Sequence, residues 1–283
     1  MKIFKNFAVL LLLLNATVWI SVFAFPNDKL QLIACDVGQG DAILINYKSF
    51  QILTDGGPDN SVSNCLSKYM PFWDRTIEVV ILTNPDKDHY QGLIDVLKTY
   101  KVENYIESYL PDSTQGYKVL QDTVGSSGTK VLKPQKGTSI RYGLMSLDII
   151  YPEGSVKTDF KSPQNNNSTV TVLIFGDFKA IFTGDIEEEA SDYMAQYINI
   201  GKVDYIKVAH HGSKNGITKS LLEQLRPKIA VISAGKKNSY GHPHKEVLDM
   251  LQEYQVKIYG TYDNGDIIFT TDGKTYQKDK FPY

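Results

Sequence analysis

An apolar run that leads into a short acidic loop constrains this chain more than any other stretch. Residues 77–82 are apolar except for Glu78; Asp86, Asp88 and His89 follow them, and a helix is expected directly after His89. Side chains at these spacings cannot all point the same way along a strand, but on a tight turn they can converge on one point. Carboxylate plus imidazole is the ligand mixture chosen by Zn²⁺ and Mn²⁺. The alternative is an acidic turn that only caps the next helix.

The histidines extend this pattern, because each follows a predicted strand or lies in the loop that a strand leads into. They are His89, His210, His211, His242 and His244. Asp185 also follows a predicted strand directly. None of these residues lies in the apolar stripe of a predicted helix, where a histidine with only a packing role is expected. Their repeated placement at strand ends favours a metal site over a helix cap.

Composition limits the remaining possibilities. The chain has 283 residues, of which 42% are hydrophobic and 11% aromatic, enough for a full core. Its net charge of −2 makes it no general electrostatic trap for nucleic acid, so such binding would need a local patch. A group of lysines near the later motifs either lines a path for phosphates or forms solvated surface: Lys207, Lys214, Lys219, Lys236 and Lys237.

The N-terminus differs from the rest of the chain. Lys2 and Lys5 precede an apolar stretch at 7–25, close to the ~20 residues that span a bilayer. Residues 22–24 also resemble a signal for peptide cleavage. We expect residues 1–25 to be a signal peptide or a membrane anchor, and residues 26–283 to form an extracytoplasmic domain, membrane-anchored or secreted.

The two cysteines, Cys35 in a predicted strand and Cys65 on a predicted helix, are open to two interpretations. Outside the membrane a disulfide is permitted, but a single pair gives little support for a disulfide framework. We interpret Cys35 as a small core residue.

The order of predicted elements changes along the chain. The early part is rich in strands joined by tight turns, and the later part alternates strands with helices. Strands are expected at 30–37, 42–47, 50–54, 77–82, 102–108, 168–175, 178–182, 203–209 and 228–234, with strand character over 130–151 and two short strands at the end. Helices are expected at 61–70, 91–100, 117–124, 186–197, 218–225 and 245–254, and a polar loop at 152–167. Two sheets packed face to face with helices outside accommodate both parts.

Six short motifs follow one another along the chain. They are Asp36-Val37-Gly38-Gln39-Gly40-Asp41-Ala42, Thr54-Asp55-Gly56-Gly57, Asp86-Lys87-Asp88-His89, Thr183-Gly184-Asp185, Val208-Ala209-His210-His211-Gly212-Ser213 and Tyr240-Gly241-His242-Pro243-His244. In these motifs the chain resembles the metallo-β-lactamase superfamily, and within it the extracytoplasmic domain of ComEC-type DNA-internalisation competence proteins. The resemblance implies an α/β (α+β) fold, a four-layer αββα sandwich over residues 26–283 with a hydrolase site at one edge.

The resemblance also implies metal ligands, with one departure. Where the superfamily has His-x-His-x-Asp-His, this chain has Asn84 and Asp86 at the two leading positions, and a further metal-binding histidine between 89 and 185 is missing. One implied site is intact: Asp88, His89, Asp185 and His211. The other retains Asp86, Asp185 and the Asn84 oxygen, a set rich in oxygen that favours Mn²⁺ or Mg²⁺ over Zn²⁺. We therefore expect Zn or Mn in one tight and one weaker site, with loss of activity as the alternative.

Further roles follow from the same resemblance. We predict catalytic roles for Asp88, His210, His242 and His244, and substrate contacts for Asn167, Ser168, Ser213 and Lys214. Asp41 is expected to hydrogen-bond its own loop, and Asp55 to order the metal loop from behind.

The implied function is that of an exported metal-dependent phosphodiesterase or nuclease acting on DNA in competence-related uptake. Its partners would be DNA or another phosphodiester, the membrane through the N-terminal segment, and a membrane DNA channel. The alternatives are a hydrolase of another extracytoplasmic phosphoester, such as a cell-wall substituent, and an inactive module that binds DNA or a partner.

Overall fold

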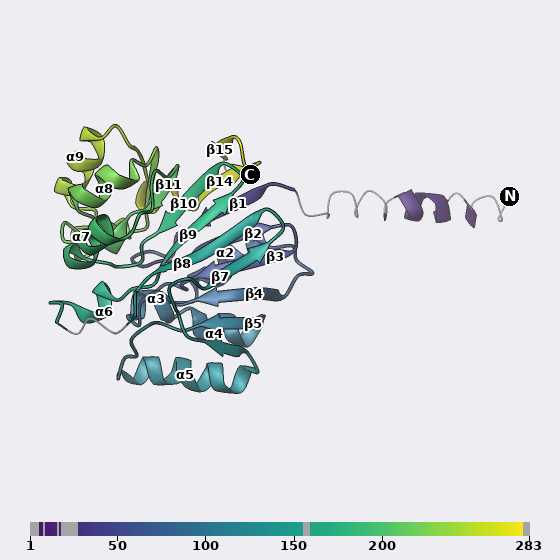
Figure 1. The fold of residues 1–283 in the computed structure, drawn as a ribbon. Helices are drawn as coiled ribbons and strands as arrows, with labels where there is room; N and C mark the ends of the chain where they lie inside the picture. The colour runs from purple at the N-terminus through teal and green to yellow at the C-terminus, as the bar shows by residue number, and fades with distance from the viewer. Residues whose placement is uncertain (1–5, 8, 16, 18–27, 155–158, 280–283) are drawn as a thin grey trace.

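The structure is a computed structural model that describes residues 6–7, 9–15, 17, 28–154 and 159–279 (Figure 1). Much of the predicted N-terminal segment lies outside these ranges, and its described residues are helical and exposed. Among the described helices, none combines the length and the apolar character that crossing a bilayer requires.

The strands of the described residues form two sheets. The first has the order β15-β14-β1-β2-β3-β4-β5-β6. Its strands are β1 (Leu30–Ala34), β2 (Ile43–Tyr47), β3 (Phe50–Thr54), β4 (Thr76–Ile81), β5 (Lys101–Ile106), β6 (Lys130–Leu132), β14 (Ile267–Thr271) and β15 (Tyr276–Lys278). The second has the order β13-β12-β11-β10-β9-β8-β7. Its strands are β7 (Ser139–Tyr142), β8 (Met145–Tyr151), β9 (Val170–Phe175), β10 (Phe178–Phe182), β11 (Tyr205–Lys207), β12 (Ile229–Ile232) and β13 (Lys257–Gly260).

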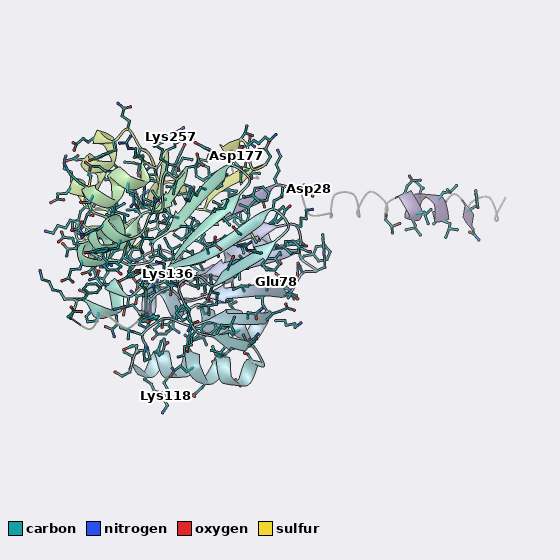
Figure 2. The ribbon with its side chains drawn as sticks, in the orientation of Figure 1. Asp28, Glu78, Lys118, Lys136, Asp177 and Lys257 are labelled. Atoms are coloured by element: carbon teal, nitrogen blue, oxygen red, sulfur yellow. A yellow bond between two sulfur atoms is a disulfide. The ribbon has the colours of Figure 1, made fainter. Side chains whose placement is uncertain are left out.

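Helices cover the outer face of each sheet, and three apolar clusters hold the layers together. The helices are α2 (Ser61–Tyr69), α3 (Lys87–Tyr90), α4 (Leu93–Thr99), α5 (Gln115–Ser127), α6 (Pro163–Asn166), α7 (Glu188–Tyr197), α8 (Lys219–Leu225), α9 (Lys245–Glu253) and α10 (Thr261–Asn264), with a 3₁₀ turn, η1 (Ala209–Gly212). Side chains of α2, α4 and α5 share a cluster with the first sheet, and those of α7, α8 and α9 share one with the second. A third cluster lies between the sheets. In Figure 2, Lys118 extends from α5 away from the body of the molecule.

Strand alternation explains this layering. In β3, Ile52 belongs to the cluster between the sheets and its neighbour Leu53 to the cluster beneath the helices. Successive side chains of a strand point to opposite faces, so a strand that is apolar at every position is buried on both sides. The predicted αββα sandwich of the α/β (α+β) class is confirmed.

The structure corrects several predicted elements. The helix expected after His89 begins at Lys87, so Asp88 and His89 lie in its first turn, and a separate helix α4 begins at Leu93. Three strands, β13, β14 and β15, follow α9 where two were expected. The loop expected at 152–167 contains α6. The hairpin on Gly176-Asp177 is confirmed by the antiparallel pairing of β9 and β10.

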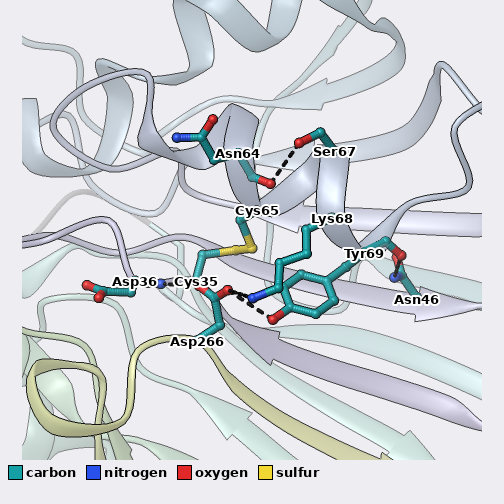
Figure 3. The surroundings of a disulfide bond; sticks show 9 residues. All are labelled: Cys35, Asp36, Asn46, Asn64, Cys65, Ser67, Lys68, Tyr69 and Asp266. Atoms are coloured by element: carbon teal, nitrogen blue, oxygen red, sulfur yellow. Dashed lines mark hydrogen bonds and ion pairs between the residues drawn. A yellow bond between two sulfur atoms is a disulfide. The ribbon is translucent and has the colours of Figure 1, made fainter. Parts of the chain in front are cut away.

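Cys35 and Cys65 form a disulfide, which corrects the interpretation of Cys35 as an unpaired core residue (Figure 3). The bond joins the end of β1 to α2, and both cysteines are buried. Next to it, Asp266 accepts hydrogen bonds from the Asp36 backbone N–H, the Lys68 ammonium and the Tyr69 hydroxyl (Figure 3). The bond therefore fixes the start of the 36–41 loop, which leads into the candidate site.

Changing both cysteines to serine is expected to lower the free energy of unfolding by about 3–4 kcal/mol, because the bond closes a loop with a sequence separation of 30. Urea unfolding with and without dithiothreitol measures this. The reductant should destabilise the natural protein and leave the double variant unchanged. Equal sensitivity of the two proteins to reductant would contradict the assignment.

Candidate metal centre

The site lies where strands of both sheets end. Asp55 follows β3, His89 follows β4, Asp185 follows β10 and His211 follows β11. The carboxyl ends of neighbouring parallel strands meet at one sheet edge, which is why residues so distant in sequence come together. His89, Asp185 and His211 are buried and, with Asp41, offer ligand atoms that all lie within 4.8 Å of one another.

Two imidazole Nε2 atoms converge on acidic oxygens. Asp185 Oδ2 lies 3.0 Å from His89 Nε2 and 3.4 Å from His211 Nε2. Asp88 Oδ2 lies 3.3 Å from His211 Nε2. A tetrahedral ion with ligands at ~2.0–2.1 Å requires ligand atoms about 3.3–3.4 Å apart. These spacings match that requirement without rearrangement of the backbone.

The opposite edges of the same two rings are held by other groups. His89 Nδ1 lies 2.9 Å from Asp55 Oδ2, and Asp55 Oδ1 also accepts the Thr83 backbone N–H at 2.8 Å. His211 Nδ1 lies 2.9 Å from the Ser233 carbonyl oxygen. A partner on Nδ1 fixes the ring and directs its Nε2 lone pair toward a metal. Asp55 thus orders the metal loop from behind, as we predicted.

Asp41 also lies on the Nδ1 side of both rings, although it was expected to hydrogen-bond its own loop. Its Oδ1 lies 3.4 Å from His211 Nδ1, and its Oδ2 lies 4.0 Å from His89 Nδ1. Asp41 is therefore placed behind the rings, whereas Asp88 and Asp185 face the Nε2 atoms.

Unsatisfied buried atoms show that the site fits a divalent cation. His89 Nε2, His211 Nε2 and Asp185 Oδ1 are buried without a hydrogen-bond partner. Leaving such groups unpaired costs about 1–3 kcal/mol each, and more for charged groups. Asp86 precedes α3 yet its side chain makes no capping hydrogen bond, which argues against the helix-cap alternative.

The charges at the site are strongly linked. Burial opposes a proton on His89 and on His211, but the nearby carboxylates outweigh it. Asp185 and Asp55 raise the pKa of His89 well above its usual value. Asp185 and Asp41 do the same for the pKa of His211. Burial disfavours ionisation of Asp185, yet His211 and His89 hold its pKa well below the usual range. A bound cation would take the place of these protons.

Backbone geometry supports a functional role for these loops. Asp55, His210 and His211 have positive φ values of 61°, 49° and 55°. Non-glycine residues held there cost of order 1–3 kcal/mol each and cluster at functional sites. Gly40 at φ 149° packs so closely that an added Cβ would lie 2.3 Å from the Asp88 carbonyl oxygen.

Lys207 is buried, whereas the sequence led us to expect it on the surface or along a path for phosphates. It is 1% exposed, and its ammonium contacts Asp41 Oδ2, with the Gly184 carbonyl oxygen at 3.3 Å and Asp185 Oδ1 at 3.8 Å. Lys207 therefore belongs neither to solvated surface nor to a path for phosphates. Period-two alternation from Tyr205, which packs between the sheets, could have placed it on the inner face.

Asn84 and Asp86 belong to the loop that leads from β4 to Asp88 and His89. The buried Asn84 donates from Nδ2 to Asn165 Oδ1 at 2.8 Å and accepts the Asp86 backbone N–H at 3.1 Å. Asn165 in turn donates to Glu187 Oε1 at 2.8 Å. Burial raises the pKa of Asp86, and the negative charges of Asp88 and Asp185 raise it further, although His89 acts in the opposite direction. A second cation would relieve this crowding of carboxylates.

A cavity of about 490 Å³ opens over the cluster. Its lining includes the predicted residues Asp86, Asp88, Asp185, His210, His211 and His242, together with residues to which the sequence analysis gave no role: Gln39, Lys87, Tyr90, Asp112, Thr114 and Tyr240. His242 stacks on Tyr240 at 5.6 Å between ring centroids, and its Nδ1 lies 3.4 Å from Gln39 Nε2. Burial and the neighbouring imidazoles of His211, His210 and His244 lower the pKa of His242 to about 4.

Other predicted residues lie further from the cavity. Ser168 is buried and its Oγ accepts the Asp185 backbone N–H at 3.2 Å, so it positions Asp185 rather than facing the cavity. Asn167 is buried and donates to the Pro163 carbonyl oxygen at 2.7 Å. Ser213 is buried, and Lys214 is exposed with its backbone N–H 3.2 Å from His244 Nδ1. These four residues and His244 are absent from the cavity lining.

The comparison with known families agrees with this geometry. The family model described as the metallo-beta-lactamase superfamily matches residues 35–236. The chain belongs to the metallo-β-lactamase superfamily. Its fold and its buried cluster of acidic and imidazole groups support metal-dependent hydrolysis and binding of a divalent metal.

Several curated proteins are similar in sequence to this chain. ComE operon protein 3 of Bacillus subtilis is 30% identical over 273 residues, which are 89% of this chain and 34% of that protein. Recombination protein 2 of Haemophilus influenzae is 28% identical over 241 residues, 84% of this chain and 28% of that protein. The chain thus spans about a third of the length of these curated relatives. The predicted resemblance to ComEC-type proteins is confirmed.

Solved structures show the fold. The metallo-beta-lactamase fold protein YhfI from Bacillus subtilis superposes with a TM-score of 0.56 at 11% identity, covering 86% of this chain and all of that one (100%).

Proposed function

We propose that this protein is a metal-dependent phosphodiesterase that cleaves DNA outside the cytoplasm during competence-related uptake. The observation that carries the proposal is the convergence of the Nε2 atoms of His89 and His211 on the Asp185 and Asp88 carboxylates beneath an open cavity. The competence-related names of several relatives support DNA as the substrate.

In this proposal Asp88, His89, Asp185 and His211 hold the tight cation, and Asp86 with Asp185 holds a weaker one. A divalent cation, Zn or Mn, supplies Lewis acidity here when bound, lowering the pKa of water and stabilising charge on phosphoryl oxygens. Asp55 and the Ser233 carbonyl keep both imidazoles aimed at the cation.

The charge of the cavity explains why a cation must bind before a phosphodiester. The lining contains carboxylates of Asp86, Asp88, Asp112 and Asp185 and the ammonium of Lys87. Such a surface repels a phosphate, and bound cations reverse that repulsion. Without metal the protein should therefore bind DNA weakly at this site.

His242 and His210 have the positions from which to handle substrate. With its pKa lowered to about 4, His242 is neutral near pH 7, and the Gln39 amide donates to its Nδ1, which leaves the proton on Nε2. That N–H would donate a hydrogen bond to a phosphoryl oxygen. His210 Nε2 lies 3.9 Å from Asp185 Oδ2 at the cavity wall and would take up or deliver the proton of the reaction.

Location outside the cytoplasm has two supports. The buried disulfide between Cys35 and Cys65 is a bond that persists in oxidising compartments. The apolar stretch at 7–25 behind Lys2 and Lys5 has the character of an export signal or anchor.

Purified protein should cleave DNA only after metal is added. We would incubate it with single- and double-stranded DNA and with bis-p-nitrophenyl phosphate, in Zn²⁺ or Mn²⁺ and in EDTA. Metal-dependent DNA cleavage is the expected result. Turnover of the small ester alone would indicate another phosphoester substrate, and DNA binding without turnover would indicate a binding module.

Asn84→His should tighten the weaker metal site, because it adds an imidazole next to Asp86. We expect the metal content to rise toward two ions per chain and Mn²⁺-dependent turnover to increase. Metal analysis by mass spectrometry and the same hydrolysis assay measure both. Asn84→Ala is the matched control, since it removes the hydrogen bond to Asn165 without adding a ligand. The idea fails if the histidine variant behaves like the alanine variant.

A further inference from the structure

Three apolar side chains stand out on the surface of the described domain. Phe72 is 79% exposed, Leu144 68% and Trp73 51%. Beyond the N-terminal segment, Phe72 and Leu144 are the most exposed large hydrophobic residues among those described. The rings of Phe72 and Trp73 pack edge to face with centroids 4.7 Å apart. Neither the fold nor the metal centre requires these residues to be apolar.

Strand register places all three at one end of the sandwich. Leu30 pairs with Tyr47, and Tyr47 pairs with Phe50. The β3–β4 register, in which Ile52 pairs with Val79, sets the start of β4 beside Phe50. Phe72 and Trp73 lie in the loop just before β4. They are therefore at the same end as the start of β1.

The β7–β8 turn that carries Leu144 joins this end from the second sheet. Tyr142 stacks on Phe50 with centroids 4.7 Å apart, and the Tyr47 ring lies 3.1 Å from the position that a Gly143 Cβ would take. We call Phe72, Trp73 and Leu144 the apolar end patch. In Figure 1, β1 and β4 both begin on the right-hand side of the drawn domain.

The metal centre is at the opposite end of the same strands. Asp55 follows the last residue of β3, and the loop with Asp86, Asp88 and His89 follows β4. A strand rises about 3.3 Å per residue, so the five residues of β3 and the six of β4 separate the two ends by roughly 15–20 Å. A surface that contacted the apolar end patch would leave the cavity facing away from it.

We propose that the apolar end patch inserts into the interfacial layer of a lipid bilayer and holds the domain upright, with its metal centre facing away from the membrane. The apolar stretch at 7–25 comes shortly before β1 in the sequence, and the first residue of β1, Leu30, lies at this same end. A chain anchored by that stretch would therefore bring the patch to the headgroup level. Tryptophan and phenylalanine are side chains that favour this layer.

The charged side chains at this end are mixed in sign. Lys48 pairs with Asp28 at 3.0 Å, and the Arg75 guanidinium lies over the Tyr100 ring at 5.4 Å. Lys48 is thus paired with an acidic group, and Arg75 directly follows Asp74 in the chain, so the apolar side chains would carry the insertion.

The test uses the full chain and its tryptophans, of which there are two, Trp19 and Trp73. In Trp19→Phe, Trp73 is the sole tryptophan and reports the patch. We would reconstitute this variant into phosphatidylcholine–phosphatidylglycerol vesicles, with and without brominated phosphatidylcholine, and record emission. The matched control is Trp19→Phe/Trp73→Phe/Tyr240→Trp, which moves the reporter to the exposed aromatic position at the cavity rim. Far-UV circular dichroism verifies that both variants fold.

Trp73 emission is expected to shift to shorter wavelength with lipid and to be strongly quenched by brominated lipid, while the control at position 240 stays unquenched. Equal quenching at both positions, or none at Trp73, would overturn the proposal. Emission at short wavelength before lipid is added, without later quenching, would mean that another protein surface covers the patch, and would also overturn it. None of these readouts depends on hydrolysis, so they stand apart from the proposed nuclease function.

Discussion

Asp185→Ala should empty the metal centre and lower metal-dependent hydrolysis by at least about a hundredfold, since even partners behind the ligands typically contribute 10–100-fold. Asp185 is the carboxylate that faces both Nε2 atoms, at 3.0 Å from His89 and 3.4 Å from His211. It is also the acidic residue shared by the two proposed cation positions. Removing it leaves two buried imidazoles without the group that brings them to one ion.

Metal content per chain and initial rates of hydrolysis measure this effect together. Asp177→Ala is the matched control, because Asp177 is an exposed carboxylate on the turn that leads into β10 (Figure 2). It should retain full metal content and activity. If Asp185→Ala kept its metal and its rate, the proposed centre would be in the wrong place.

Lys207→Met should destabilise the fold by about 3–5 kcal/mol, the usual cost of leaving a buried charge without its partner. Burial disfavours the ammonium, but Asp41 and Asp185 raise the pKa of Lys207, so the side chain stays charged. Burial likewise opposes ionisation of Asp41, and Lys207, His211 and His89 outweigh it to lower its pKa to about 2. Without Lys207, Asp41 loses the cation that contributes most to holding its pKa down.

Urea unfolding measures the loss, with the exposed Lys118→Met on α5 as the control for a lysine-to-methionine change (Figure 2). The double variant Asp41→Asn/Lys207→Met should recover part of the stability, because it removes the charge that Lys207 compensates. A single variant as stable as the natural protein would show that Lys207 is not needed to balance the cluster.

Much of the candidate site followed from the sequence because its residues mark strand ends. His89, Asp185 and His211 each follow an apolar strand, and strand ends of a sandwich meet at one edge, so their meeting could be predicted without coordinates. Asp55 was expected to order the metal loop from behind, and in the structure it does so through the Nδ1 atom of His89. These are local signals combined with a simple topological rule.

The surroundings of the site did not follow in the same way. Ser168 was predicted to touch substrate but positions Asp185, and Asn84 is engaged with Asn165 across a long sequence separation. Which hydrogen bonds a polar loop residue makes depends on the loops opposite, and sequence periodicity does not describe those contacts.

The sequence by itself determined the layered fold, most of the strands along the chain and the edge at which acidic and imidazole groups gather, because side-chain alternation and strand ends depend on local sequence patterns. Only the tertiary structure decided that Lys207 is buried between Asp41 and Asp185, that Cys35 pairs with Cys65, and that Phe72, Trp73 and Leu144 share one end. Each of those facts is a distance between segments far apart in sequence, and such distances are set by how the two sheets register and pack against each other.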